Sequence, residues 1–302
     1  MIISASYKTD IPAFYGDWFL NRLAAGYCLV ANPYGGPVQR VALNRGAVDG
    51  FIFWTRNAAP FGAALDRVAE LGYPFLLHYT ITGYPKALDA ATPAAAAGIA
   101  DFRALADKWG GRRLVWRYDP VLLSSLTPAP WHAANFAKLA RDLRGATDEV
   151  VLSFAQIYRK TRSGLNRAAR DADFEWNDPI DADKRSLLAE LASSAADNGM
   201  RASLCGQPDL LPGLLGAGLG EASCIDAHRL SDIAGHHIEA GGRSHRQGCA
   251  CAGSKDIGAY DTCPHGCAYC YAVSRRGTAK NRRAGHDAEA EILGSTLGAR
   301  IG

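Results

Sequence analysis

The segment "GFIFWTRNAAPFGAALDRVAELGYPFLLHYT", residues 50–80, carries the pattern that sets the fold class. Residues 51–54 and 75–77 are short runs rich in Phe, Ile and Leu, as expected for strands buried on both faces. Between them, apolar residues in 61–71 recur three and four positions apart, and the stretch ends at Gly72, which is typical of a helix. A strand, a helix and a strand in this order predict a βαβ unit with parallel strands.

The same alternation extends over most of the chain. Runs that predict strands are "MIISAS", "YCLVANP", "DGFIFWT", "PFLLHYT", "RRLVWRYDP", "EVVLSFA" and "RASLCG". Stretches with helical spacing lie between them, among them "PAFYGDWFLNRLAAG", "PAAAAGIADFRALADKWG", "PWHAANFAKLARDL" and "ADKRSLLAELASSAADNG". We therefore expect an α/β fold, namely a TIM-like (β/α) barrel that is irregular or open. A doubly wound open sheet is the alternative.

The composition and periodicity of the sequence change after Gly235. Residues 236–302 are rich in Gly, Cys, His and Arg and show little periodicity. A stretch this long without its own core needs a metal or a scaffold to order it. We expect a barrel domain at 1–235 and a Cys-rich metal-cluster segment at 236–302, packed over the barrel mouth.

The composition, with 48% hydrophobic and 21% charged residues and a net charge of +3, is typical of a globular protein. The chain has no apolar run long enough for a membrane span, which needs about 18 residues. Its first residues, "MIISASYKTDIPAFY", do not resemble a secretory signal. We therefore expect a cytoplasmic protein with no membrane partner.

Seven of the eight cysteines lie in the last third of the chain. In a reducing compartment such clustering favours metal ligation over disulfides. Cys263, Cys267 and Cys270, in Cys-x3-Cys-x2-Cys spacing, can wrap one corner of a 4Fe–4S cluster and leave one iron open to a fourth cysteine, a substrate or a cofactor. Zinc is the alternative metal, because Cys267 and Cys270 form a Cys-x2-Cys pair.

The loop "CPHGCAYCY", residues 263–271, resembles the cluster-binding loop of the radical S-adenosylmethionine (SAM) superfamily, and that of spore photoproduct lyase and its relatives in particular. The resemblance implies that the three cysteines ligate the cluster and that the open iron binds the amino and carboxylate groups of SAM. Reductive cleavage would then give a 5′-deoxyadenosyl radical that abstracts hydrogen from a substrate. An aromatic precedes the third cysteine in that superfamily, and Tyr269, a candidate cofactor contact, stands there here. The superfamily loop follows the first barrel strand, whereas this one follows the last predicted strand.

A broader resemblance covers nearly the whole chain. The segments "ISASYKTDIPAFYGDWFLNRL", "FIFWTRN", "LVWRYDP", "LSFAQIYRK" and "CACAGSKDIGAYDTCPHGCAYCYA" are similar to those of the bacterial domain-of-unknown-function family catalogued as 1848. That family is described as carrying C-terminal cysteines similar to the radical SAM motif. The resemblance implies the fold and the cluster and leaves the substrate open.

The remaining C-terminal cysteines allow two arrangements. Cys249 or Cys251 can be the fourth ligand of the same cluster, which would close the site. Alternatively, both join Cys205 and Cys224 in a second four-thiolate site that holds an iron–sulfur cluster or zinc.

Polar side chains recur where the apolar runs end and are nearly absent within them. Because the carboxyl ends of parallel strands form the ligand-binding face, we expect a polar, anion-tolerant pocket there. The candidates for catalytic or substrate contacts are Arg117, Asp119, Lys8 and Asp10, and Arg56 is the candidate for a cofactor contact. The alternative for Arg117 and Asp119 is that they pair with each other and cap the next loop.

A basic stretch follows the cysteines and comprises Arg275, Arg276, Lys280, Arg282 and Arg283. Such a stretch can attract the phosphates of a nucleic acid. A solvated loop, or arginines that neutralise an anionic cluster, is the simpler interpretation.

The resemblance of the cysteine loop thus favours a radical SAM-like enzyme. The alternatives are a metal-stabilised binding module with a closed site, for which nucleic acid is one candidate ligand, and a non-radical barrel enzyme with a structural cluster. The substrate is a small molecule or a nucleic acid, and an electron donor is a further partner if the cluster is redox-active.

Overall fold

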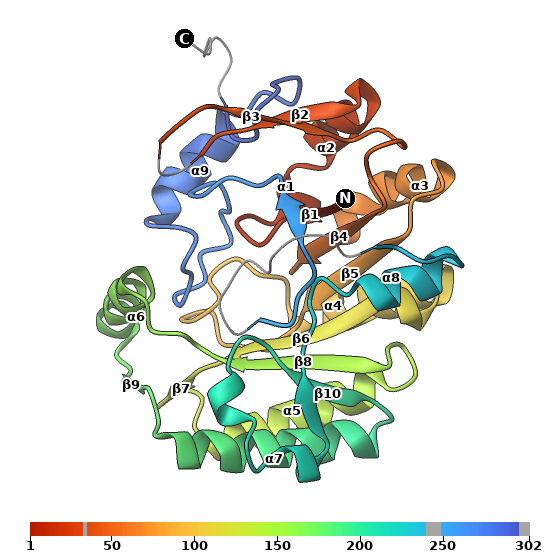
Figure 1. Cartoon of the computed structure of the whole chain (residues 1–302). Coiled ribbons are helices and arrows are strands. Elements are labelled where there is room, and N and C mark those ends of the chain that lie inside the picture. Colours follow the sequence, from red (N-terminus) through yellow and green to blue (C-terminus); the bar gives the residue numbers. More distant parts are fainter. Residues whose placement is uncertain (33–34, 240–248, 296–302) are drawn as a thin grey trace.

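The computed structural model describes residues 1–32, 35–239 and 249–295. Its main element is an eight-stranded sheet in the order β11-β10-β8-β6-β5-β4-β1-β12, in which all neighbouring strands are parallel (Figure 1). The strands are β1 (Ile2–Ala5), β4 (Gly50–Thr55), β5 (Phe75–Thr80), β6 (Leu114–Val121), β8 (Glu149–Phe154), β10 (Arg201–Leu204), β11 (Leu219–Glu221) and β12 (Ser254–Asp256). The parallel α/β fold expected from the alternating pattern is therefore confirmed.

Helices follow most strands, and several of them cover one face of the sheet. They are α1 (Ile11–Phe14), α2 (Gly16–Ala25), α3 (Gly62–Glu70), α4 (Ala95–Trp109), α5 (Ala129–Leu143), α6 (Arg159–Ala172), α7 (Asp181–Asp197), α8 (Ala227–Ala234) and α9 (Arg276–Ala284). Figure 1 shows α5 and α7 packed along β6, β8 and β10. Buried side chains of α2, α3, α4, α5 and α7 join those of the strands, such as Phe53 and Leu77, in one hydrophobic core. We call this side of the sheet the helix face.

The other side, which we call the cavity face, receives the alternate side chains of each strand. In β6, Trp116 and Tyr118 belong to the helix face, where both rings contact Phe136 of α5. Arg117 and Asp119 point to the opposite side and line a cavity. One strand therefore supplies both core side chains and site side chains.

Helix α8 covers the cavity face near the amino ends of the strands. Its Leu230 packs with Ile2, Ile52 and Leu76 from three neighbouring strands. Its buried Arg229 donates to Glu149, the first residue of β8, at 2.9 Å. Since this end of the cavity face is filled, open space is left toward the carboxyl ends.

The sheet follows the chain order except at its last strand. From β1 to β11 each strand lies beside its predecessor in the sheet, and β12 returns to pair with β1. Within the described residues, β11 and β12 are the two edges and no strand pairing closes the sheet between them. A closed barrel is therefore absent from the described part of the chain.

Three sequence expectations differ from the structure. The run "YCLVANP" forms β2 (Tyr27–Val30), which pairs antiparallel with β3 (Gln39–Ala42) outside the main sheet. Of its four residues only Cys28 is buried, so this strand has only one packed position and does not suit a sheet interior. Strands β11 and β12 are missing from the predicted set because each has three residues and lacks an apolar run.

Smaller elements complete the fold. β7 (Leu123–Ser124) and β9 (Trp176–Asn177) form a short antiparallel pair. The basic stretch, expected as a loop, contains α9. Within the described residues, no helix combines the length and apolar character needed to cross a membrane. Residues 240–248 and 296–302 of the predicted Cys-rich segment lie outside the described residues.

Candidate functional site

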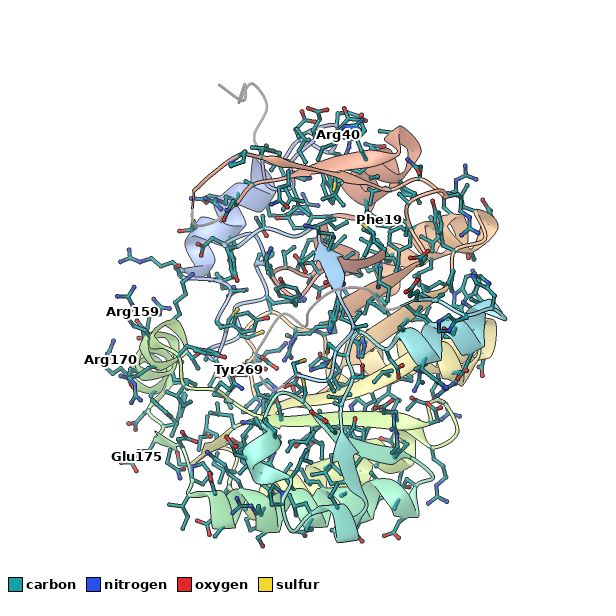
Figure 2. All side chains as sticks on the ribbon, viewed as in Figure 1. Phe19, Arg40, Arg159, Arg170, Glu175 and Tyr269 are labelled. Atoms are coloured by element: carbon teal, nitrogen blue, oxygen red, sulfur yellow. The ribbon has the colours of Figure 1, made fainter. Side chains whose placement is uncertain are left out.

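A cavity of about 1260 Å³ lies over the carboxyl ends of the strands, on the cavity face. Every residue that the sequence singled out as a candidate lines it: Lys8, Asp10, Arg56, Arg117, Asp119, Cys205, Cys224, Cys249, Cys251, Cys263, Cys267, Tyr269 and Cys270. In Figure 2, Tyr269 lies in the central region enclosed by the ribbon, whereas Arg170 and Glu175 are at the surface. Residues far apart in the sequence therefore meet around one space.

The loop of residues 259–272, which we call the clip, follows β12 and forms one wall of the cavity. Tyr269 of the clip donates to Oδ1 of Asp89 at 2.7 Å, and Arg56 Nη2 donates to the Tyr269 hydroxyl at 2.6 Å. Arg56 also pairs with Oδ2 of Asp89 at 2.7 Å. The three side chains form a closed network, so Arg56 and Tyr269 fix the clip against the ends of β4 and β5.

A second set of hydrogen bonds holds the first half of the clip. His265 Nε2 lies 2.8 Å from Oδ2 of Asp10, which also accepts the backbone N–H of Arg56 at 2.8 Å. The hydroxyl of Tyr15 donates to the Thr262 carbonyl at 2.7 Å. Asp10 therefore anchors the clip through His265. The other ring nitrogen of His265, Nδ1, lies 3.4 Å from the carbonyl oxygen of Ala91.

The clip thiols are partly exposed toward the cavity. Burial, together with the neighbouring Asp10 and Cys270, raises the pKa of Cys263 to about 12. Burial also raises the pKa of Cys267 and of Cys270. Because burial disfavours the charged thiolate form of these cysteines, a bound cation or cluster is the kind of partner that would stabilise it.

The other four cavity cysteines lie together, apart from the clip. The sulfurs of Cys205 and Cys224 are 3.3 Å apart. Cys251 packs in the same small hydrophobic cluster as this pair. Its sulfur also accepts the backbone N–H of Cys224 at 3.2 Å. Cys251 thus contacts the Cys205–Cys224 pair, and Cys249, two residues earlier in the chain, lines the same cavity.

In the described part of the chain, no group of three or more His, Cys, Asp or Glu side chains is already arranged to hold a metal ion. This observation concerns sites for a single ion, whose ligands must converge on one point. Cysteines that bind different irons of one cluster need not do so. Metal binding by either set of thiols requires adjustment of the side chains that now contact each other.

Arg117 connects the second thiol set to the polar part of the cavity. It donates to the Cys224 sulfur at 3.0 Å through Nη1 and to Asp119 at 3.0 Å through Nε. Ser153 donates to the other carboxylate oxygen of Asp119. Burial acts to raise the pKa of Asp119, but Arg117 and Ser153 hold it below the usual value. Asp119 is therefore an ionised carboxylate at the cavity wall, and it does pair with Arg117.

The structure also shows important residues that the sequence did not indicate. Asp256, in β12, accepts hydrogen bonds from Ser4 at 2.7 Å and Ser6 at 2.9 Å, and Lys8 lies 3.4 Å from it. Asp89 lies in an irregular loop between β5 and α4. The only signal for Asp256 was its place in "GSKDIG" just before the clip, and Asp89 had none.

Not every strand-end side chain points into the cavity. Tyr79 donates to Asp101 of α4 at 2.9 Å, and the Tyr118 hydroxyl lies 2.9 Å from His132 Nδ1 of α5. Both follow the alternation of their strands to the helix face.

Two arginines of the basic stretch hold the backbone of the clip. Arg276 donates to the Pro264 carbonyl at 3.1 Å, and Arg282 donates to that of Tyr260 at 3.0 Å. Arg283 stacks over the ring of Tyr15. These contacts give the stretch a structural role beside the clip.

Residues 2–272 match the family model described as a domain of unknown function, DUF1848, and the chain belongs to that family. Comparison with curated proteins and with solved structures found no match.

Proposed function

We propose that this member of the DUF1848 family is an enzyme that binds a 4Fe–4S cluster through Cys263, Cys267 and Cys270 and uses S-adenosylmethionine at the same site. The observation that carries the proposal is the convergence of the three clip thiols and several charged side chains on one large cavity. The cavity lies over the carboxyl ends of parallel strands, where α/β proteins bind their ligands. At about 1260 Å³ it has room for a cofactor and a substrate together.

The topology of the sheet supports this assignment. The clip follows β12, and β12 is the edge strand that pairs with β1. Counted from that edge, β12 is first and the other strands follow in chain order up to β11. The clip thus follows the first strand in spatial order, as the resembling loop does in the radical SAM superfamily. We propose a TIM-like arrangement, permuted so that the first strand is encoded last.

The donor set suits the proposed cluster. Thiolates are the usual ligands of iron–sulfur clusters, and three of them leave one iron of a 4Fe–4S cluster free for another ligand. When bound, such a cluster would supply the electron for cleavage of the S–C5′ bond of SAM, which would release methionine and a 5′-deoxyadenosyl radical able to take a hydrogen atom from a substrate. The clip thiols are partly exposed on the cavity side, so a ligand on the free iron would lie in the cavity.

The side chains of this chain have separate tasks in the proposal. Asp10, Asp89 and Arg56 hold the clip in place through buried bonds. Lys8 places an ammonium group at the cavity wall and favours anionic groups such as the carboxylate of SAM. Asp119, kept ionised by Arg117, can accept hydrogen bonds from a bound ligand and orient it.

The test uses the full chain purified without oxygen and given SAM and dithionite. We expect formation of 5′-deoxyadenosine by the native chain and its loss in Cys263→Ala, Cys267→Ala and Cys270→Ala. Cys28→Ala is the matched control, because Cys28 is buried in the hydrophobic core away from the cavity. The proposal is overturned if the native chain, loaded with iron, forms no 5′-deoxyadenosine, or if the clip variants form as much as the control.

A further inference from the structure

The amino end of α6 lies at the edge of the cavity, and the proposed SAM site does not use it. Four consecutive residues at this end line the cavity: Tyr158, Arg159, Lys160 and Thr161. The first hydrogen bond of the helix runs from the N–H of Arg162 to the carbonyl of Tyr158 at 2.9 Å. The N–H groups of the three residues between them therefore have no partner within the helix, and among the described residues no side chain caps this end. Free N–H groups at the amino end of a helix favour a bound anion.

The hydroxyl of Thr161 is a second, independent indication of a ligand. Thr161 is the third residue of α6, so its side chain starts in the same turn as the free N–H groups. It is only 1% exposed, and its hydroxyl has no hydrogen-bond partner in the described part of the chain. Because a buried hydroxyl without a partner costs free energy, this group is expected to donate to a bound ligand.

Basic side chains surround this end of the helix. Arg159 and Lys160 are exposed, and Figure 2 shows Arg159 at the surface. Lys160 lies over the ring of Tyr260 in the clip, 5.5 Å from the ring centroid. Arg282 of α9, which also lines the cavity, donates to the carbonyl of Tyr260 at 3.0 Å. Cations from α6 and α9 thus meet at one clip residue, where they favour an anionic group of a ligand.

Aromatic rings beside the same end favour a nucleotide among anionic ligands. Tyr158, the residue before α6, is 45% exposed. Its ring lies 6.4 Å from that of Tyr271 in the clip, in an edge arrangement, and both residues line the cavity. Aromatic side chains next to positive charge are the combination on which proteins stack bases while they hold the phosphates.

We infer that the amino end of α6 binds the phosphate of a nucleotide unit, and that the substrate of the cavity carries such a unit, either free or within a nucleic acid strand. The free N–H groups and the Thr161 hydroxyl donate to the phosphate oxygens, and Lys160 supplies the counter-charge. The ring of Tyr158 contacts the base. The inference rests on the proposed function, since it names the substrate class of the same cavity.

The surface outside the cavity favours a strand over a free nucleotide. Arg162, Arg167 and Arg170 are exposed along α6, and Arg275 and Lys280 are exposed at α9. Figure 1 shows α6 and α9 on the same side of the molecule. A strand that placed one phosphate at the amino end of α6 would bring its neighbouring phosphates close to these cations.

The test measures binding by the full chain, purified without oxygen. The probes are uridine, uridine 5′-monophosphate (UMP) and a fluorescein-labelled single-stranded DNA of about 12 nucleotides. Calorimetry follows the first two and fluorescence anisotropy the third. We expect UMP, the DNA or both to bind, and uridine, which lacks the phosphate, to bind at least about 10-fold more weakly than UMP if UMP binds.

Thr161→Val is the decisive variant. It keeps the shape and the net charge, and it removes a hydroxyl without a partner among the described residues, so stability is expected to stay the same or to rise. Binding of the phosphate probe is expected to weaken about 10-fold, and Lys160→Gln is expected to have a similar effect. Lys138→Gln is the matched control, because Lys138 is an exposed lysine of α5 that pairs with Asp142.

The double variant R167Q/R170Q separates the two sources of the phosphate. Weaker binding of the DNA with unchanged binding of UMP assigns a strand, whereas unchanged binding of both probes assigns a free nucleotide. The inference is overturned if the native chain binds neither UMP nor the DNA, or if Thr161→Val binds them as tightly as the control. Failure of the proposed function gives a different result, in which the native chain binds a phosphate probe but forms no 5′-deoxyadenosine from SAM.

Discussion

Tyr269, the residue before the last clip cysteine, donates a 2.7 Å hydrogen bond to Asp89, a carboxylate only 1% exposed in the loop after β5. The other oxygen of Asp89 accepts from Arg56 at 2.7 Å and from Thr82 at 3.1 Å. One buried carboxylate thus joins the clip to two strand ends. The position of the clip cysteines depends on a residue that is 174 positions earlier than Cys263 in the chain.

Replacing Asp89 with Asn tests this junction. Arg56 is then left largely buried without its counter-charge, and we expect a loss of about 3 kcal/mol in the free energy of unfolding. Asp66→Asn is the matched control, because the pair of Asp66 with Lys108 is exposed and is expected to contribute less than about 1 kcal/mol. Urea unfolding of both variants measures the difference. Equal effects would contradict the role given to Asp89.

The close approach of α6 to the clip gives a second prediction. A Cβ atom added at Gly164 would lie 2.3 Å from the carbonyl oxygen of Ala268, so the helix or the clip must move. We expect Gly164→Ala to cost about 1–3 kcal/mol and to lower the iron content of the purified protein. Gly277→Ala, in α9, meets no atom within 4 Å and is expected to be neutral or to stabilise by up to about 1 kcal/mol. Unchanged iron and stability in Gly164→Ala would show that the clip tolerates displacement.

Lys8 tests the proposed anion-binding wall. If its ammonium group contacts the carboxylate of SAM or an anionic substrate, Lys8→Gln removes a charge-assisted interaction of about 1.5–3 kcal/mol. We expect a fall of about 10- to 100-fold in kcat/KM with unchanged iron content. Lys255→Gln is the control, since Lys255 is exposed on β12 and donates only to Gln39 among the described hydrogen bonds. A kinetic effect as large in the control would remove Lys8 from the site.

The Arg117–Asp119 pair predicts a dependence of stability on pH. Burial acts to raise the pKa of Asp119, but Arg117 and Ser153 overcome it and hold the pKa below the usual value. The ionised carboxylate therefore stabilises the fold fully above about pH 4, the ordinary range for an unfolded Asp. This contribution is lost as the pH falls through the lower pKa of the folded state. In Asp119→Asn, we expect urea unfolding between about pH 5 and pH 2 to show a smaller loss of stability than in the native chain. Parallel pH profiles would contradict the assignment.

The sequence predicted those parts of the fold that carry a repeated pattern. Strands such as β4 and β5 are apolar runs with a helix between them, and β6 ends in alternating residues of which Arg117 and Asp119 face the cavity. The expected pocket followed from the rule that parallel strands end on one side. The spacing of the clip cysteines singled out the loop without any tertiary information.

The parts that could not be predicted depend on contacts between distant segments. β12 has the sequence Ser-Lys-Asp, and it is a strand only because its backbone pairs with β1. Asp256 gains its importance from two serines that are about 250 positions earlier. The sequence left open whether Cys251 lies with the clip cysteines or with Cys205 and Cys224. Its contact with Cys224 depends on the path of the chain between β11 and α8, which no local pattern encodes.

The most direct test of the central claim is the EPR spectrum of the reduced, anaerobically purified chain with and without SAM. The account predicts a 4Fe–4S signal that changes when SAM is added in the native chain and in Cys28→Ala. It also predicts that the change is absent in Cys270→Ala. A spectrum of the native chain that is indifferent to SAM would contradict an open iron at the clip.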